Sequence, residues 1–96
     1  MRILTCDDIR QTLDEGAILL DVRNTDEFDR GALPNAKNIP LAVLPILAHE
    51  RLDKENSVLV YCHAGARAMM AEKLLTSLGF SNVRSIGGII HFQHCY

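Results

Sequence analysis

The chain has 96 residues, a length that predicts one domain spanning 1–96. Its formal charge is −2 and its 10 basic residues are spread out, so it lacks the basic stripe of a nucleic-acid-binding protein. No apolar run is long enough to span a membrane, and acidic residues come too early for a signal peptide. We therefore expect a cytoplasmic protein without nucleic-acid or membrane partners.

The first predicted elements are a strand, a helix and a second strand. Residues 2–5 are expected to form a short strand, and Thr5-Cys6-Asp7-Asp8 then has the character of a helix capping box. The helix that begins there should stop at Gly16. The continuous apolar run at 17–22 is typical of a strand that is covered on both faces.

The middle of the chain predicts two helices around a brief strand. A second capping signal, Asn24-Thr25-Asp26-Glu27, indicates a short helix that ends near Gly31. Residues 36–40 leave room for a short strand. A further helix should run from about Pro45 to Leu52, because proline is tolerated in the first turn of a helix and not in its interior.

The last third of the chain continues the alternation of strands and helices. An apolar strand at 57–61 precedes a helix at 68–78 with an apolar face, and a last strand is expected at 82–86. Gly87-Gly88 predicts a turn. A final short helix should begin at 89–92.

This alternation, with its short connections, predicts an α/β fold of three layers. A central, mostly parallel five-stranded sheet would carry helices on both faces. Ligands of such sheets bind beyond the carboxyl ends of the strands. Cys62, Asp21 and Arg23 each follow or end a predicted strand, so we expect all three at that edge.

The three cysteines, Cys6, Cys62 and Cys95, are widely spaced and odd in number, which is a poor pattern for a disulfide framework. Cys6 is expected to pack on the core face of the first helix, and Cys95 to be exposed. His91, His94 and Cys95 lie close together, but no fourth ligand is near in sequence, so a polar terminal turn is favoured over a metal site.

The chemistry of the chain is predicted to centre on Cys62, where an apolar strand ends and a loop leads into a helix. The amides of such a loop and the helix N-terminus stabilise negative charge on sulfur, which makes Cys62 the candidate catalytic nucleophile. A buried structural cysteine is the alternative that the spacing leaves open. The candidate substrate-binding residues are His63, Ala64, Gly65, Ala66 and Arg67.

Several separate motifs, in the right order, resemble the rhodanese family of sulfurtransferases. The strand that ends in Asp21-Val22-Arg23 is similar to the family's strand ending in Asp-Val-Arg. Residues 27–40 resemble its E-F-x-x-G-H-I-P-G-A-x-N-I-P segment, and residues 60–67 resemble its active-site strand and loop. Residues 79–83, followed by Gly87-Gly88, resemble its closing segment.

This resemblance implies a rhodanese-like fold and a two-step transfer of sulfane sulfur. The Cys62 thiolate would take the outer sulfur of a donor such as thiosulfate and release sulfite, and its persulfide would then pass the sulfur to cyanide or a thiol. Such covalent catalysis needs no metal and no organic cofactor. The implied partners are a small sulfur donor (thiosulfate or a persulfide) and a thiol acceptor or a sulfur-relay protein.

The resemblance leaves the roles of the supporting residues open. Arg67 is expected either to contact sulfonate oxygens or to brace the loop through a carboxylate, for which Asp21 is the candidate. Asp21 and Arg23 either line the pocket or pair to hold the loops together, and the supporting role is favoured. His63 either tunes the charge of the loop or faces solvent.

Three other functions remain as alternatives: a persulfide carrier or partner-docking module with little thiosulfate activity, a phosphatase-like enzyme, and an inactive regulatory domain. Phosphatases and arsenate reductases with a similar cysteine loop place five residues between cysteine and arginine. This chain has four, His63 to Ala66. By family analogy the smaller ring favours sulfur transfer.

Overall fold

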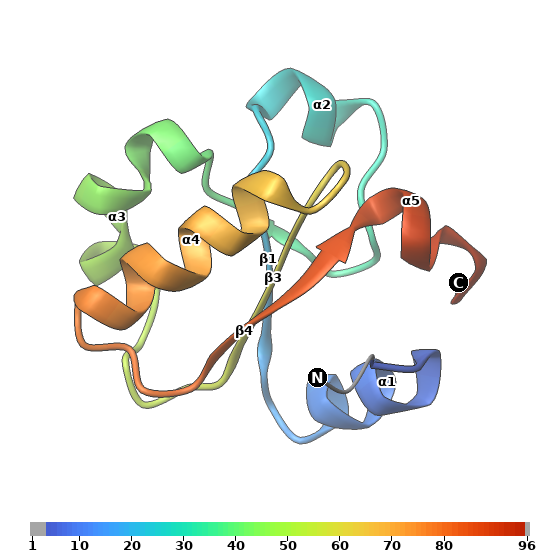
Figure 1. Cartoon of the computed structure of the whole chain (residues 1–96), viewed down its shortest axis with the longest axis horizontal. Coiled ribbons are helices and arrows are strands. Elements are labelled where there is room, and N and C mark those ends of the chain that lie inside the picture. The colour runs from blue at the N-terminus through green and yellow to red at the C-terminus, as the bar shows by residue number, and fades with distance from the viewer. Residues whose placement is uncertain (1–3, 96) are drawn as a thin grey trace.

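A parallel β-sheet with helices on both faces forms the centre of the molecule (Figure 1). The computed structural model describes residues 4–95. Within that range the sheet has four strands in the order β2-β1-β3-β4, all parallel. The strands are β1 (Ile18–Asp21), β2 (Lys37–Asn38), β3 (Val58–Cys62) and β4 (Val83–Gly88). The predicted α/β class is confirmed.

The sheet has one strand fewer, over residues 4–95, than the five we expected. Half of the expected first strand at 2–5, residues 2 and 3, lies outside the described residues. Of its residues that are described, Leu4 and Thr5 are not in a strand. Thr5 instead caps the first helix, since its side chain accepts a hydrogen bond from the backbone N–H of Asp8 at 3.1 Å. The capping box was predicted correctly. It uses Thr5, which was also the last residue of the expected strand.

One face of the sheet is covered by α3 (Leu44–Arg51) and α4 (Ala66–Ser77), which lie together on that side (Figure 1). Side chains alternate along a strand, so every second residue of β3 points to these helices. The buried cluster on this face contains Val58, Val60 and Cys62 from β3 together with Ala68, Ala71 and Leu75 from α4. The small alanines of α4 let the helix approach the sheet closely.

The opposite face is covered by α1 (Cys6–Asp14) and α5 (Ile89–Phe92) (Figure 1). Leu59 and Tyr61, the alternate residues of β3, are buried there with Ile9 of α1 and Phe92 of α5. The central strand is thus buried on both sides, as its continuous apolar sequence predicts.

Two shorter helical segments connect the sheet to its helices. α2 (Thr25–Asp29) follows β1 and lies beyond the carboxyl end of the sheet (Figure 1). The 3-10 turn η1 (Leu41–Val43) leads into α3, and Pro45 stands in the first turn of α3, as proline requires. Over residues 4–95, no helix has the length and apolar composition needed to cross a bilayer.

A disulfide joins the two ends of the described chain, which contradicts our interpretation of the cysteines. Cys6, at the start of α1, is bonded to Cys95 in the 3-10 turn η2 (Gln93–Cys95), across a sequence separation of 89 residues. The prediction failed because sequence spacing does not show that α1 and the C-terminal turn lie on the same face of the sheet. Cys62 is a free, buried cysteine.

Candidate active site

Cys62 is the last residue of β3 and is almost fully buried, with 1% of its surface exposed. It follows Val58 and Val60 in the alternation of the strand, so its side chain points to the face that α4 covers. The loop that follows carries the chain over the sulfur and into α4. The sulfur therefore lies below this loop, at the carboxyl edge of the sheet where we expected it.

The sulfur of Cys62 accepts hydrogen bonds from two backbone amides. The N–H of Gly65 lies 3.1 Å from Sγ, and the N–H of Ala68 lies 3.4 Å from it. Ala68 belongs to the first turn of α4, whose amides lack partners within the helix and carry the positive end of its dipole. The sequence predicted the helix to begin at 68, so it missed Ala68 as a donor to the sulfur.

Gly65 makes this geometry possible. It precedes α4 with a φ of +118°, a left-handed conformation that residues with a side chain rarely adopt. This conformation turns the chain so that the amide of Gly65 points back at Cys62.

Arg67 braces the loop, and its partner is Glu27 of α2. Nη1 and Nη2 of Arg67 donate to the two carboxylate oxygens of Glu27 at 2.7 and 3.0 Å. Asp21, the carboxylate that we had chosen for this role, is engaged elsewhere. Two carboxylates lie near the same sheet edge, and only the position of α2 decides which of them reaches the guanidinium.

The pairing of Glu27 with Arg67 shifts the pKa values of both side chains. The hydrogen bond from Arg67 holds the pKa of Glu27 at about 2, below its ordinary 4.5, although burial opposes this. A further hydrogen bond from the backbone N–H of Asn24, at 3.1 Å, acts in the same direction as Arg67. The same pairing raises the pKa of Arg67. Glu27 therefore carries its charge throughout the neutral range.

Asp21 and Arg23 form a second, buried pair that supports the neighbouring loop. Nη2 of Arg23 donates to Oδ2 of Asp21 at 2.7 Å and to the carbonyl oxygen of Gly31 at 2.8 Å. The guanidinium also lies 5.7 Å from the centre of the Tyr61 ring. The hydroxyl of Tyr61 accepts from the N–H of Leu33 at 3.1 Å. The predicted pairing of Asp21 with Arg23 is thus present, and it fixes residues 31–33 against the sheet.

The end of β4 supports the loop from below, which corrects another prediction. Gly87 and Gly88 pair with Tyr61 and Cys62 as part of β4 and do not form a turn. A side chain at Gly88 would collide with the backbone of His63 and Ala64. Gly88 is therefore needed for the close approach of the strand to the loop, and not for a reversal of the chain, whereas Gly87 has a φ of +102° that favours glycine.

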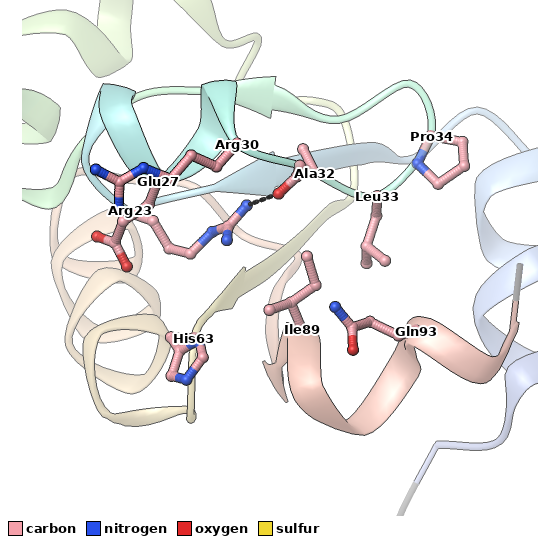
Figure 2. Close-up of a pocket in the computed structure, with 10 residues that line it drawn as sticks. Arg23, Glu27, Arg30, Ala32, Leu33, Pro34, His63, Ile89 and Gln93 are labelled. Atoms are coloured by element: carbon pink, nitrogen blue, oxygen red, sulfur yellow. Dashed lines mark hydrogen bonds between the residues drawn. The ribbon is translucent and has the colours of Figure 1, made fainter.

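An open cleft of about 610 Å³ lies beside the loop (Figure 2). His63 extends into it from the loop, facing Arg23 and Arg30 on one side and Ile89 and Gln93 on the other. The exposed position of His63 fits either of its two predicted roles. Arg23 is paired with Asp21 and Glu27 with Arg67, so His63 and Arg30 are the groups of this lining that could attract a small anion.

A second cleft, of about 580 Å³, lies on the other side of the same loop. Ala64, Gly65 and Ala66 of the loop line it, together with Met69 and Lys73 of α4. Met69 is 58% exposed. All the predicted loop residues thus border one of the two clefts or brace the loop between them.

The candidate site thus consists of a buried free thiol at the end of β3 and a loop that Arg67 braces through Glu27. The family described as "Rhodanese-like domain" matches residues 5–94 of the chain. The chain belongs to this family. Its predicted identity as a rhodanese-like protein is confirmed.

Known members of the rhodanese-like family resemble the chain over most of its length. A relative from Schizosaccharomyces pombe is 34% identical over 91 residues, which cover 82% of this chain but span only 64% of that relative. Thiosulfate sulfurtransferase PspE of Escherichia coli is 34% identical over 71 residues, covering 73% of this chain and 68% of that protein. The solved structure of the human single-domain sulfurtransferase TSTD1 matches with a TM-score of 0.83 and 26% identity, covering 98% of this chain and 96% of that one.

Three contributors to this rhodanese-like site were missed from the sequence: Glu27, Ala68 and Gly88. Glu27 lies in a segment that we had quoted for the family resemblance, and that was the signal available for it. Ala68 required the true start of α4. Gly88 required the register of β4 against β3.

Proposed function

We propose that the chain is a sulfurtransferase that moves sulfane sulfur through a persulfide on Cys62. One observation carries the proposal. The sulfur of Cys62 lies at the N-terminus of α4 and accepts hydrogen bonds from the backbone N–H groups of Gly65 and Ala68. Membership of the rhodanese-like family and the name of the E. coli relative PspE support thiosulfate as the donor.

In the first step the Cys62 thiolate attacks the outer sulfur of thiosulfate. A new S–S bond forms to Cys62, the bond between the outer and central sulfurs of thiosulfate breaks, and its electron pair leaves with sulfite. The terminal sulfur of the resulting persulfide carries the negative charge that the thiolate brought. Amides at a helix N-terminus stabilise that charge without having to reorganise.

In the second step an acceptor removes the outer sulfur. Cyanide or a thiolate attacks the terminal sulfur of the persulfide, the S–S bond breaks, and Cys62 is regenerated as the thiolate. With cyanide the product is thiocyanate. No oxidant or reductant is consumed, because the donor and the acceptor exchange one sulfur atom between them.

The contacts of Arg67 suggest that it acts as a positioning residue. Both of its terminal nitrogens are occupied by Glu27, so the donor would meet other positive groups first. His63 and Arg30 line the cleft beside the loop, and the side chain of Arg30 is 78% exposed. We assign these two residues to the recognition of the sulfonate oxygens.

Steady-state kinetics test this proposal. Initial rates of thiocyanate formation, measured while thiosulfate and cyanide are varied together, should give parallel double-reciprocal lines, because the sulfite leaves before cyanide reacts. The Cys62→Ser protein should form no thiocyanate above the uncatalysed rate. Intersecting lines, or turnover by the serine variant, would contradict the persulfide route.

Turnover of thiosulfate, compared with the loading of Cys62 by a persulfide, distinguishes the alternative function of a persulfide carrier. A carrier would turn over thiosulfate slowly but would be loaded quickly by a low-molecular-weight persulfide. If Cys62 gained sulfur from the persulfide but not from thiosulfate, the chain would be assigned to sulfur relay. The formation of a persulfide on Cys62 would still hold in that case.

A further inference from the structure

The two ends of the described chain bring three metal-binding side chains together, away from the Cys62 loop in sequence. Cys6 lies at the start of α1, and His94 and Cys95 lie in η2. Their ligand atoms, two sulfurs and a ring nitrogen, all lie within 4.8 Å of one another. The sequence had grouped His91 with His94 and Cys95, and the structure replaces His91 by Cys6.

His94 faces this cluster. Its Nε2 lies 3.5 Å from the sulfur of Cys6, although the residue is exposed and had other directions open to it. His91, three residues earlier, instead accepts from the N–H of Gly88 through Nδ1 at 3.3 Å. One of the two neighbouring histidines thus points at the sulfurs and the other does not.

We propose that Cys6, Cys95 and His94 bind a zinc ion when the disulfide between the two cysteines is reduced. Two thiolates and one imidazole are a donor set that zinc prefers, with a water completing the tetrahedron. Ligand atoms of a tetrahedral zinc lie roughly 3.3 to 3.8 Å apart, as bond lengths of about 2.0 to 2.3 Å require. Nε2 of His94 already lies 3.5 Å from the sulfur of Cys6, and the two sulfurs must move apart once the bond between them is broken.

The surroundings of the cluster favour thiolates and access from solvent. Cys6 is the first residue of α1, a helix of nine residues whose N-terminus attracts negative charge. Arg10 also lies nearby, since its Nη2 donates to the backbone carbonyl oxygen of Cys95 at 3.1 Å, but its charge is offset by Asp7, to which its Nη1 donates at 3.2 Å. Cys6 and Cys95 are partly buried and His94 is exposed, so an ion can reach the site.

The redox state selects between the two forms of the site. A dithiol reductant breaks the Cys6–Cys95 bond, giving two thiols while the reductant becomes a cyclic disulfide. Zinc then displaces one proton from each thiol and binds the two thiolates with the neutral ring of His94. The disulfide form has no thiolates to offer, so it does not bind the ion. Either form ties η2 to α1, and Gln93 of η2 lines the cleft beside the Cys62 loop.

Zinc titration of the full chain tests the proposal. The titrated protein carries the substitution Cys62→Ser, so that the thiol of the proposed active site cannot bind the metal. A chromophoric chelator that competes for zinc reports the binding. After reduction with a phosphine, we expect one zinc ion per chain and the release of two protons, and we expect no binding by the oxidised chain. Co²⁺ in place of zinc should give a sulfur-to-metal charge-transfer band.

Two histidine variants provide the matched comparison. His94→Ala and His94→Gln should each weaken binding by the reduced chain by more than about 100-fold, because the loss of an outer-shell partner alone costs about 10- to 100-fold. His91→Ala should leave the affinity unchanged. The proposal is overturned if the reduced chain binds no zinc, if the oxidised chain binds it equally well, or if the His94 variants bind as tightly as their parent.

Discussion

The single contact that most changes the interpretation of this site is the one between Arg67 and Glu27. From the sequence, Arg67 is equally suited to hold an anionic donor or to brace the loop. In the structure both terminal nitrogens of its guanidinium donate hydrogen bonds to Glu27, which is 40 residues away in sequence. The identity of that partner was beyond the sequence, because Asp21 and Glu27 both lie near the same edge of the sheet. The position of Cys62 itself was predictable, since it depends only on where an apolar strand ends.

The titration of Glu27 predicts how this pair contributes to stability. The pKa of Glu27 in the folded protein, about 2, is below its ordinary 4.5. The pair therefore stabilises the fold fully above pH 4.5 and loses that contribution as the pH falls toward 2. Glu27→Gln should lower the free energy of unfolding by about 1 kcal/mol at pH 7, a modest value because the pair is partly exposed. The difference from the parent protein should shrink below pH 4.5.

Urea unfolding of both proteins between pH 2.5 and pH 7 measures this difference. Asp26→Asn is the matched control, because Asp26 lies in the same short helix and its closest approach to Arg30 is 3.8 Å. It should show no comparable dependence on pH. A gap between Glu27→Gln and the parent that stays constant across this range would contradict the assigned role of the pair.

At the scale of the elements, the last residues of β4 set the height of the loop above the sheet. The sequence predicted the strands and helices well, because continuous apolar runs, capping residues and glycine stops are local signals. It failed at Gly87-Gly88, where a glycine pair is equally typical of a turn. Gly87 has a φ of +102° that favours glycine, and Gly88 is needed for a close contact with His63 and Ala64, which lie 25 and 24 residues earlier in the sequence. Local patterns do not contain such a contact.

Gly88→Ala tests the dependence of the site on this approach. The added methyl group would collide with the carbonyl oxygen of His63, so the loop must shift. We expect a loss of about 1 to 3 kcal/mol in stability from overpacking. We also expect kcat/KM for sulfur transfer to fall on the order of 100-fold, as misplacement of a reacting group by about 1 Å can cause.

Gly16→Ala separates the two effects of that substitution. Gly16 has a φ of +104°, so alanine is strained there, but an added Cβ meets nothing within 4 Å. This variant should lose about 1 kcal/mol of stability and keep its activity per folded molecule. If Gly88→Ala also kept its activity per folded molecule, β4 would not position the loop.

At the scale of the whole molecule, the described chain is closed into a ring by its disulfide. Cys6 and Cys95 are 89 residues apart, and α1 and α5 bring them together on one face of the sheet. The sequence indicated both helices but not that they cover the same face, which depends on the handedness and order of the connections. The expected compartment, the cytoplasm, stays a prediction, because nothing in the fold tests it.

Reduction of this disulfide should make the protein less stable. Cross-linking distant residues restricts the unfolded chain, and a disulfide typically contributes about 2 to 4 kcal/mol in this way. Urea unfolding with and without a phosphine reductant, in the presence of a metal chelator, measures the difference. Cys62→Ser should show the same difference, because Cys62 is not part of the bond. Equal stability of the oxidised and reduced proteins would contradict the constraint.

The mass of the protein after exposure to thiosulfate tests the central claim most directly. A persulfide adds one sulfur atom, about 32 Da. We predict that this mass is gained once per chain, that peptide mapping places it on Cys62, and that cyanide removes it. A Cys62→Ser chain that gained the same mass, or a parent protein that gained none from thiosulfate or from a low-molecular-weight persulfide, would contradict sulfur transfer through this residue.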